Sequence, residues 1–131
     1  HCHLPFTYIE SRGPGCALFR GNLFENFIIT QIIKGFYHHG LKPPCYFWRD
    51  KSGKELDLII DKGNSFTAVE IKSGATLNAD YFKNIEYVQK ISGLPHNEYY
   101  IIYTGSAEQD RKYVKVRNWQ SLAHLFHKSP V

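Results

Sequence analysis

The sequence predicts a single α/β domain, and three observations support this prediction. At 131 residues, the chain is long enough to bury one hydrophobic core. Hydrophobic residues make up 43% of it, which favours a packed interior over disorder. Segments with helical spacing of apolar residues alternate with short runs typical of strands. The predicted order is helix, three strands, helix, strand, strand, helix.

The predicted domain occupies residues 21–131. Residues 1–20 before it contain two prolines and two glycines and show no regular pattern of apolar residues. The chain also contains no methionine, which is not expected of a chain that begins at its own start codon. We therefore expect residues 1–20 to be an irregular linker from an upstream region, and the chain to be a piece of a longer protein.

The first predicted helix starts after Asn22, a residue type that caps helix N-termini, and ends near Gly40. Pro43 and Pro44 prevent its continuation. The apolar residues that keep helical spacing in this segment are Leu23, Phe27, Ile28, Ile32, Ile33 and Phe36. This stripe predicts that the helix packs against a sheet.

Three strands are predicted next, over residues 45–49, 55–61 and 65–72. The last two are joined by Gly63-Asn64, which is typical of a two-residue hairpin loop. In the second half of the chain, a helix capped by Asn78 is expected to present Phe82, Ile85, Val88 and Ile91 on one face and to end at Gly93 and Pro95. Strands over 98–103 and 113–116 and a closing helix over 119–126 complete the prediction.

The hairpin loop fixes which residues face each other. It places Leu58 opposite Val69, Ile60 opposite Thr67 and Leu56 opposite Ile71, so one face of the hairpin is apolar. The other face then carries Asp57 directly opposite Glu70, with Ile59 opposite Ala68 between this pair and the loop, and Lys72 on the same side.

Two facing carboxylates have Cβ atoms ~4.5–5.5 Å apart and repel each other. At ~5 Å, the repulsion is on the order of 3 kcal/mol for an effective dielectric near 20. In a site shielded from water, a proton or a divalent cation between them removes this cost, and Mg²⁺ commonly binds one or two carboxylates together with waters and a substrate phosphate. We therefore interpret Asp57, Glu70 and Lys72 as candidate catalytic residues, with Asp57 and Glu70 as metal ligands. A half-exposed hairpin with an ordinary Glu55–Lys72 ion pair is the alternative.

Glu25 is a further candidate metal ligand. Its helical neighbours Ile28, Ile29 and Ile32 form an apolar stripe, so its carboxylate is expected near the sheet, where it needs a partner. Asn22 and Glu25 also have the spacing of a capping box, in which Glu25 satisfies the N-terminus of the helix. Both interpretations stay open at this point.

Several motifs occur together in a fixed order. They are GNLFENF at 21–27, FWRD at 47–50, ELD at 55–57 and VEIKS at 69–73. Over residues 20–120, this series resembles the carboxy-terminal domain of unknown function found in prokaryotic AAA+ ATPases. That domain looks like a member of the PD-(D/E)XK nuclease-like superfamily.

The resemblance implies a restriction-endonuclease-like core, which runs helix, three-strand meander, helix, strand, with a mixed central sheet. By motif, Asp57 matches the first acidic position, Glu70 the second, Lys72 the lysine and Glu25 the helix glutamate. Leu56 replaces the proline that precedes the first acidic position in the family pattern. The resemblance also implies an attached AAA+ ATPase module, but no GxxxxGK[ST] motif occurs in the chain. We therefore expect no ATP on this fragment.

The expected function is that of a metal-dependent nuclease-like domain, which acts on nucleic-acid phosphodiesters with Mg²⁺ or Mn²⁺. The alternatives are a non-catalytic DNA- or protein-binding accessory domain of the ATPase, and an oligomerisation module. Composition adds only broad limits. No apolar run approaches the ~18 residues of a membrane span, and the three scattered cysteines fit free thiols in a reducing cytoplasm.

The end of the chain is basic. Asp110 is the last acidic residue, and Arg111, Lys112, Lys115, Arg117 and Lys128 follow it. Because Lys and Arg clusters contact phosphates, we select Lys112, Lys115 and Arg117 as candidate nucleic-acid-binding residues. A solvated strand and helix face accounts for the same pattern and remains an alternative.

Overall fold

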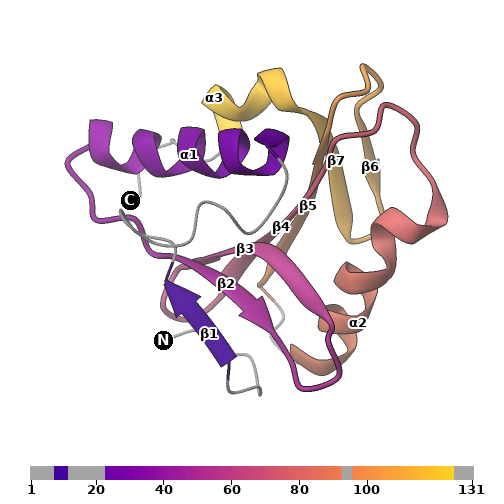
Figure 1. The fold of residues 1–131 in the computed structure, drawn as a ribbon, viewed down its shortest axis with the longest axis horizontal. Coiled ribbons are helices and arrows are strands. Elements are labelled where there is room, and N and C mark those ends of the chain that lie inside the picture. Colours follow the sequence, from indigo (N-terminus) through magenta and orange to yellow (C-terminus); the bar gives the residue numbers. More distant parts are fainter. Residues whose placement is uncertain (1–7, 12–22, 93–95, 126–131) are drawn as a thin grey trace.

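The computed structural model describes residues 8–11, 23–92 and 96–125, and these form an α/β domain (Figure 1). Within these ranges, seven strands make one mixed sheet in the order β1-β2-β3-β4-β5-β7-β6. The strands are β1 (Tyr8–Ser11), β2 (Cys45–Arg49), β3 (Glu55–Asp61), β4 (Phe66–Lys72), β5 (Glu98–Tyr103), β6 (Gln109–Arg111) and β7 (Val114–Asn118). The helical segments are α1 (Leu23–His38), η1 (Ala79–Phe82), α2 (Lys83–Ser92), η2 (Trp119–Ser121) and α3 (Leu122–Leu125).

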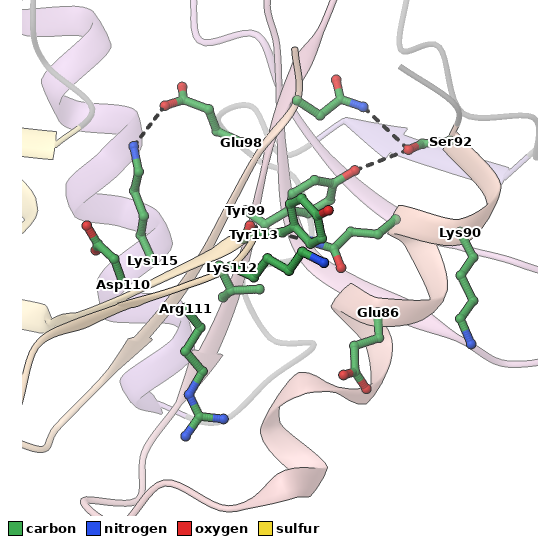
Figure 2. Close-up of a pocket in the computed structure, with 13 residues that line it drawn as sticks. Glu86, Lys90, Ser92, Glu98, Tyr99, Asp110, Arg111, Lys112, Tyr113 and Lys115 are labelled. Carbon is green, nitrogen blue, oxygen red and sulfur yellow. Dashed lines mark hydrogen bonds and ion pairs between the residues drawn. The ribbon is translucent and has the colours of Figure 1, made fainter. Parts of the chain in front are cut away.

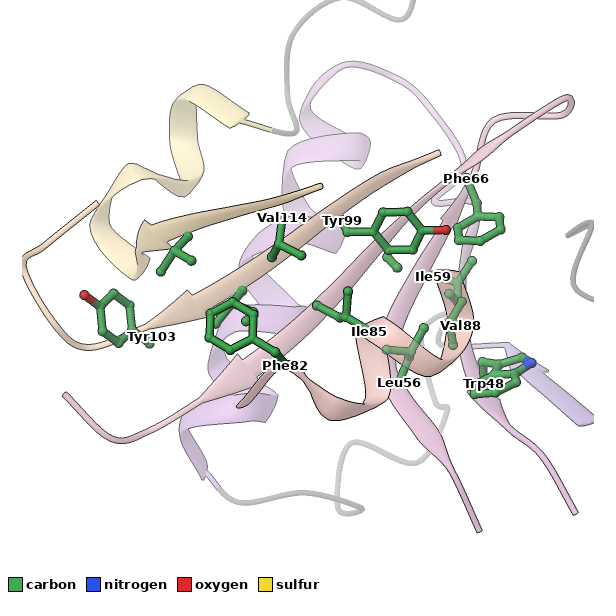
Figure 3. Close-up of a cluster of buried hydrophobic side chains, with 13 residues drawn as sticks. Trp48, Leu56, Ile59, Phe66, Phe82, Ile85, Val88, Tyr99, Tyr103 and Val114 are labelled. Carbon is green, nitrogen blue, oxygen red and sulfur yellow. The ribbon is translucent and has the colours of Figure 1, made fainter. Parts of the chain in front are cut away.

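The sheet separates two hydrophobic clusters, and the helices cover both (Figure 1). On one face, α1 and α3 pack over the first cluster. Its buried residues are Ile28, Ile29, Ile32, Ile33, Cys45, Leu58, Ile60, Val69, Ile71, Tyr100, Ile102 and Leu122. On the other face, η1 and α2 pack over the second cluster (Figure 3). Its buried residues are Trp48, Leu56, Ile59, Phe66, Ala68, Phe82, Ile85, Val88, Tyr99, Ile101, Tyr103, Val114 and Val116.

Helix α1 ends as the sequence predicts, at a glycine in the left-handed conformation. Gly40 has φ 70°. Its N–H donates to the carbonyl oxygen of Tyr37 at 2.9 Å, and the N–H of Leu41 donates to that of Phe36 at 2.9 Å. These two bonds form a Schellman motif, which satisfies carbonyls that the last helical turn leaves without partners. Asn22, the predicted N-cap, lies outside the described residues.

The predicted hairpin is confirmed. Gly63 has φ 88°, and the N–H of Lys62 donates to the carbonyl oxygen of Ser65 at 2.9 Å. The paired residues run from Asp61 opposite Phe66 to Leu58 opposite Val69, in the predicted register. Strands β2, β3 and β5 also have their predicted bounds.

Strand β3 contains an irregularity where it pairs with β2. Tyr46 lies opposite Ile59, and Trp48 lies opposite Leu56. Two residues of β3, at 57–58, therefore stand against a single residue of β2, which is a β-bulge.

The bulge corrects one predicted pair. The simple register expected Leu56 opposite Ile71 on the apolar face that α1 covers. Leu56 instead packs beneath α2 with Ile59, while Ile71 packs beneath α1. The reason is that one extra residue in the strand reverses the alternation of side chains before it. Asp57 lies at the bulge itself.

Two strands depart from the predicted pattern. Tyr8–Ser11 was expected to be part of an irregular linker, but it pairs with β2 in antiparallel orientation. Gln109–Arg111 was not predicted, and it pairs with β7. All three of its residues are exposed, so this short strand carries no apolar pattern that sequence reasoning could detect.

Further boundaries differ from the prediction. Strand β7 covers Val114–Asn118, whereas the prediction was 113–116. The last helix begins as the 3₁₀ segment η2 before it continues as α3. The expected end of the second helix at Gly93 and Pro95 lies outside the described residues. No helix in the described part of the chain is long and apolar enough to cross a membrane.

Replacing Gly40 by alanine is expected to destabilise the domain by about 1 kcal/mol, because a Cβ atom disfavours the left-handed conformation. Among the described residues, nothing lies within 4 Å of the position that this Cβ would take, so the loss reports the backbone alone. Gly40→Asn is the matched control and should lose less, since asparagine tolerates this conformation better. Urea unfolding measures both variants, and equal losses would contradict the explanation.

Candidate functional site

Glu70 is a buried carboxylate in the middle of the sheet. Strand β4 lies between β3 and β5, and Glu70 is only 2% exposed. Its side chain faces α2, where the Nδ2 of Asn84 lies 3.4 Å from its Oε2. A buried carboxylate needs hydrogen-bond donors or a cation to offset the loss of water.

Asp57 and Glu70 exchange hydrogen bonds with the opposite strand. The N–H of Asp57 donates to Oε1 of Glu70 at 3.2 Å. The N–H of Ile71 donates to Oδ2 of Asp57 at 2.7 Å. These contacts lie beyond the last paired residues of the hairpin, Leu58 and Val69. Each carboxylate therefore accepts from a backbone N–H of the neighbouring strand, and the two carboxylates are held beside each other as the sequence predicts.

The surroundings of Glu70 disfavour its charged form. Burial raises the pKa of Glu70 well above its ordinary value, and the negative charge of Asp57 raises it further. The Lys72 ammonium acts in the opposite direction but does not cancel these effects. The pair thus favours binding of a positive species, either a proton or a metal cation, between or beside the two carboxylates.

Lys72 joins the same cluster. Its Nζ lies 3.4 Å from Oε2 of Glu70 and 5.7 Å from the centre of the Tyr81 ring. Burial alone would lower the pKa of Lys72, but the carboxylates of Glu70 and Asp57 raise it above its ordinary value. Lys72 is therefore a cation at neutral pH. The alternative Glu55–Lys72 ion pair does not form. Oε2 of Glu55 lies 3.7 Å from Nε of Arg49, and Lys72 pairs with Glu70.

Two residues near the site were missed by sequence reasoning. Asn84 contacts Glu70, and Tyr81 lies beside Lys72. Gly74 lies against Tyr81, and a Cβ at this position would require the Tyr81 hydroxyl to move. Only the polar character of Asn84, next to the apolar stripe of α2, could have signalled its role. The placement of Tyr81 beside Lys72 depends on how η1 and α2 cross the sheet.

Glu25 is not brought together with the other two carboxylates. It lies half-buried in the first turn of α1, on the face of the sheet opposite to Asn84 and α2. Ile28, Ile29 and Ile32 are buried as predicted. Among the described residues, no group of three or more His, Cys, Asp or Glu side chains has the spacing of a metal site. The predicted three-carboxylate cluster is therefore not present among the described residues, and α1 packs on the face of the sheet opposite to α2.

The basic residues near the end of the chain are not all uncompensated, as their order in the sequence suggested. Lys115 lies 3.4 Å from Glu98, and Arg117 lies 2.7 Å from Asp110. Lys112 is exposed, and its Nζ lies 5.2 Å from the centre of the Tyr113 ring.

Comparison with known families identifies a family whose model covers most of the chain. The model of the family described as "Domain of unknown function (DUF4143)" matches residues 20–122. The chain belongs to this family. The match includes Asp57, Glu70 and Lys72 and both layers of helix around them. No curated protein sequence matches the chain.

The raised pKa of Glu70 predicts how the stability of the metal-free domain depends on pH. Folding raises this pKa from its ordinary value of 4.5, so the folded state holds the proton more tightly than the unfolded chain. The free energy of unfolding should therefore fall as pH rises above 4.5 and level off above the folded pKa. Glu70→Gln should flatten this dependence.

Urea unfolding at a series of pH values, with EDTA present, measures the effect. Glu55→Gln is the matched control, because Glu55 lies on the neighbouring strand and is only half-buried. It should leave the pH dependence close to that of the wild type. A wild-type protein that gains stability as pH rises through this range would contradict the assignment to Glu70.

Proposed function

We propose that this domain is a metal-dependent nuclease-like domain that acts on nucleic-acid phosphodiesters. The observation that carries the proposal is the contact of a buried Glu70 with both Asp57 and the Lys72 ammonium. Carboxylates that hold a divalent cation, with a lysine beside them, suit hydrolysis of a phosphodiester. Strongly perturbed pKa values in such a cluster are typical of functional sites.

The donor set fits Mg²⁺ or Mn²⁺. These ions prefer oxygen ligands, and Mg²⁺ is commonly held by one or two carboxylates, with waters and substrate phosphates in the other positions. Asp57 and Glu70 supply two carboxylates at one place, and we leave Glu25 out of the proposed ligand set because no group of three such side chains occurs among the described residues. When bound, such an ion lowers the pKa of a water ligand and neutralises charge on the phosphate.

The chain's own residues would then have separate roles. Asp57 and Glu70 hold the cation, each kept in place by a hydrogen bond from a backbone N–H. Lys72 places its ammonium beside the attacked phosphate, where it stabilises developing negative charge or orients the attacking water. Asn84 and Tyr81 position Glu70 and Lys72 from the helical side of the site.

We also propose the placement of this domain in the PD-(D/E)XK nuclease-like superfamily. The order α1, β2, β3, β4, α2, β5 and the mixed sheet support this placement, since they match the restriction-endonuclease-like core. We further propose attachment to an AAA+ ATPase module, on the basis of the same resemblance, and a cytoplasmic location, on the basis of the scattered cysteines. Shared architecture supports the presence of a site and leaves its substrate to experiment.

A second candidate is a non-catalytic accessory domain that binds DNA or protein. The observation that favours it is the internal satisfaction of the cluster. Both carboxylates accept hydrogen bonds from the backbone, and Lys72 already pairs with Glu70. A cluster closed in this way can stabilise the junction of β3 and β4 without any metal.

Calorimetric titration of Mn²⁺ separates the two functions. Wild type should bind the ion, whereas Asp57→Asn and Glu70→Gln should each weaken binding by more than about tenfold, because each removes a charged ligand. Asp57→Asn keeps an oxygen that can accept from Ile71, so the strand junction is preserved. Glu55→Gln removes a carboxylate from the same strand and should leave binding unchanged.

Cleavage of single- and double-stranded DNA and RNA is then measured with Mn²⁺ or Mg²⁺. Lys72→Ala should retain Mn²⁺ binding but lose cleavage by about 10²-fold or more, since it removes an electrostatic contact to the transition state. A wild type that binds no Mn²⁺, or an Asp57→Asn variant that binds it equally well, favours the accessory domain.

A further inference from the structure

A groove separates α2 from the β6–β7 hairpin (Figure 2). It has a volume of about 990 Å³. Residues of α2, including Glu86 and Lys90, form one wall, and residues 110–115 form the other. This groove is distinct from the carboxylate site, because none of Asp57, Glu70 and Lys72 lines it.

Two of the three carboxylates in the groove are neutralised by ion pairs. Glu98 lies 2.7 Å from Lys62 and 3.4 Å from Lys115. Asp110 lies 2.7 Å from Arg117. These contacts remove Lys115 and Arg117 from the set of cations that could bind a partner.

Three other cationic side chains line the groove, together with one further carboxylate, Glu86. Lys90, Arg111 and Lys112 are exposed and line the groove, and none of them forms an ion pair with a carboxylate among the described residues. The guanidinium of Arg111 stacks over the Phe82 ring at 4.3 Å, which holds it in place beside α2. With Glu86 counted, the groove keeps an excess of positive charge. That excess is complementary to a polyanion.

An aromatic ring lies next to one of these cations, Lys112. Tyr113 lines the groove and is 64% exposed, and Nζ of Lys112 lies 5.2 Å from its ring centre. Large exposed aromatic side chains beside Lys or Arg form stacking platforms for unpaired bases, with the cations on the phosphates. An acidic peptide would use the cations but would gain nothing from stacking on the ring. A duplex keeps its bases stacked inside and would also leave the ring unused.

We propose that this groove binds single-stranded nucleic acid. Lys90, Arg111 and Lys112 contact phosphates, and a base stacks on Tyr113. The inference rests on the proposed function, in which the substrate is a nucleic acid, and it specifies that this nucleic acid is single-stranded. Of the residues that the sequence predicts for nucleic-acid binding, Lys112 keeps this role. Lys90 and Arg111 replace Lys115 and Arg117.

Fluorescence anisotropy with a labelled oligothymidylate of about 12 nucleotides, a length within the range of known single-strand sites, tests the inference. EDTA is present throughout, so the carboxylate site cannot contribute through a metal. The combined variant Lys90→Ser, Arg111→Ser, Lys112→Ser should reduce the slope of log K against log salt by about 2 for three phosphate contacts. The matched control replaces three other exposed lysines, Lys34, Lys42 and Lys51, by serine and should leave the slope nearly unchanged.

Tyr113 provides an independent measurement. Tyr113→Ala should weaken binding at least about fivefold, whereas Tyr113→Phe keeps the ring and should bind like wild type. Because all the substituted side chains are exposed, the variants are expected to fold, and circular dichroism checks this.

Three results would overturn the inference. In the first, both triple variants lose the salt slope equally. In the second, a duplex binds as tightly as the single strand. In the third, oligothymidylate fails to bind at low salt while a poly-glutamate peptide binds. A domain that binds the single strand through the groove but takes up no Mn²⁺ would support this inference and overturn the proposed metal site, so the two failures are distinguishable.

Discussion

At the junction of β3 and β4, hydrogen bonds to the carboxylates of Asp57 and Glu70 oppose the electrostatic repulsion between them. Each carboxylate accepts a backbone N–H from the opposite strand, and hydrogen bonds to charged groups contribute about 1.5–3 kcal/mol each. Repulsion between two carboxylates at ~5 Å is of the same order, about 3 kcal/mol at an effective dielectric near 20. The junction is therefore held in place without being strongly stable in itself. The remainder of the fold must keep it closed.

The hydrophobic clusters on both faces of the sheet provide that support. Leu58 and Val69 anchor the hairpin under α1, one residue away from the two carboxylates. On the other face, Phe82 and Ile85 of η1 and α2 are buried against the sheet, which brings Asn84 between them over Glu70. A polar cluster that lowers stability can persist where such packing fixes its surroundings, and this is common at functional sites.

The features of the fold that depend on local sequence patterns were predictable from the sequence. The Gly63-Asn64 loop sets the register of the hairpin, so the approach of Asp57 to Glu70 followed from the sequence alone. It could not show the β-bulge at 57–58, which depends on pairing with the more distant β2. Nor could it place Glu25, because the stripe on α1 indicates that the helix packs on a sheet but does not indicate which face.

The prediction from sequence was also wrong for the charges of Lys115 and Arg117, because their partners are brought close only by folding. Lys115 and Arg117 lack acidic residues after them in the sequence, but their partners Glu98 and Asp110 precede them and are brought close by the neighbouring strands β5 and β6. Compensation of charge is a property of distance in space, which a count along the chain does not measure. The same folding leaves Arg111 and Lys112, at the turn of the hairpin, without carboxylate partners among the described residues.

The carboxylate site and the groove share one structural element. Tyr81 lies beside Lys72 of the site, and the next residue, Phe82, lies under Arg111 of the groove. Both belong to η1, whose start is fixed by Asn78, since its Oδ1 accepts the N–H of Asp80 at 3.0 Å. Because the two side chains leave adjacent positions of one short turn, a change in the conformation of η1 displaces both. The orientation of Lys72 and the position of Arg111 therefore depend on the same turn of backbone.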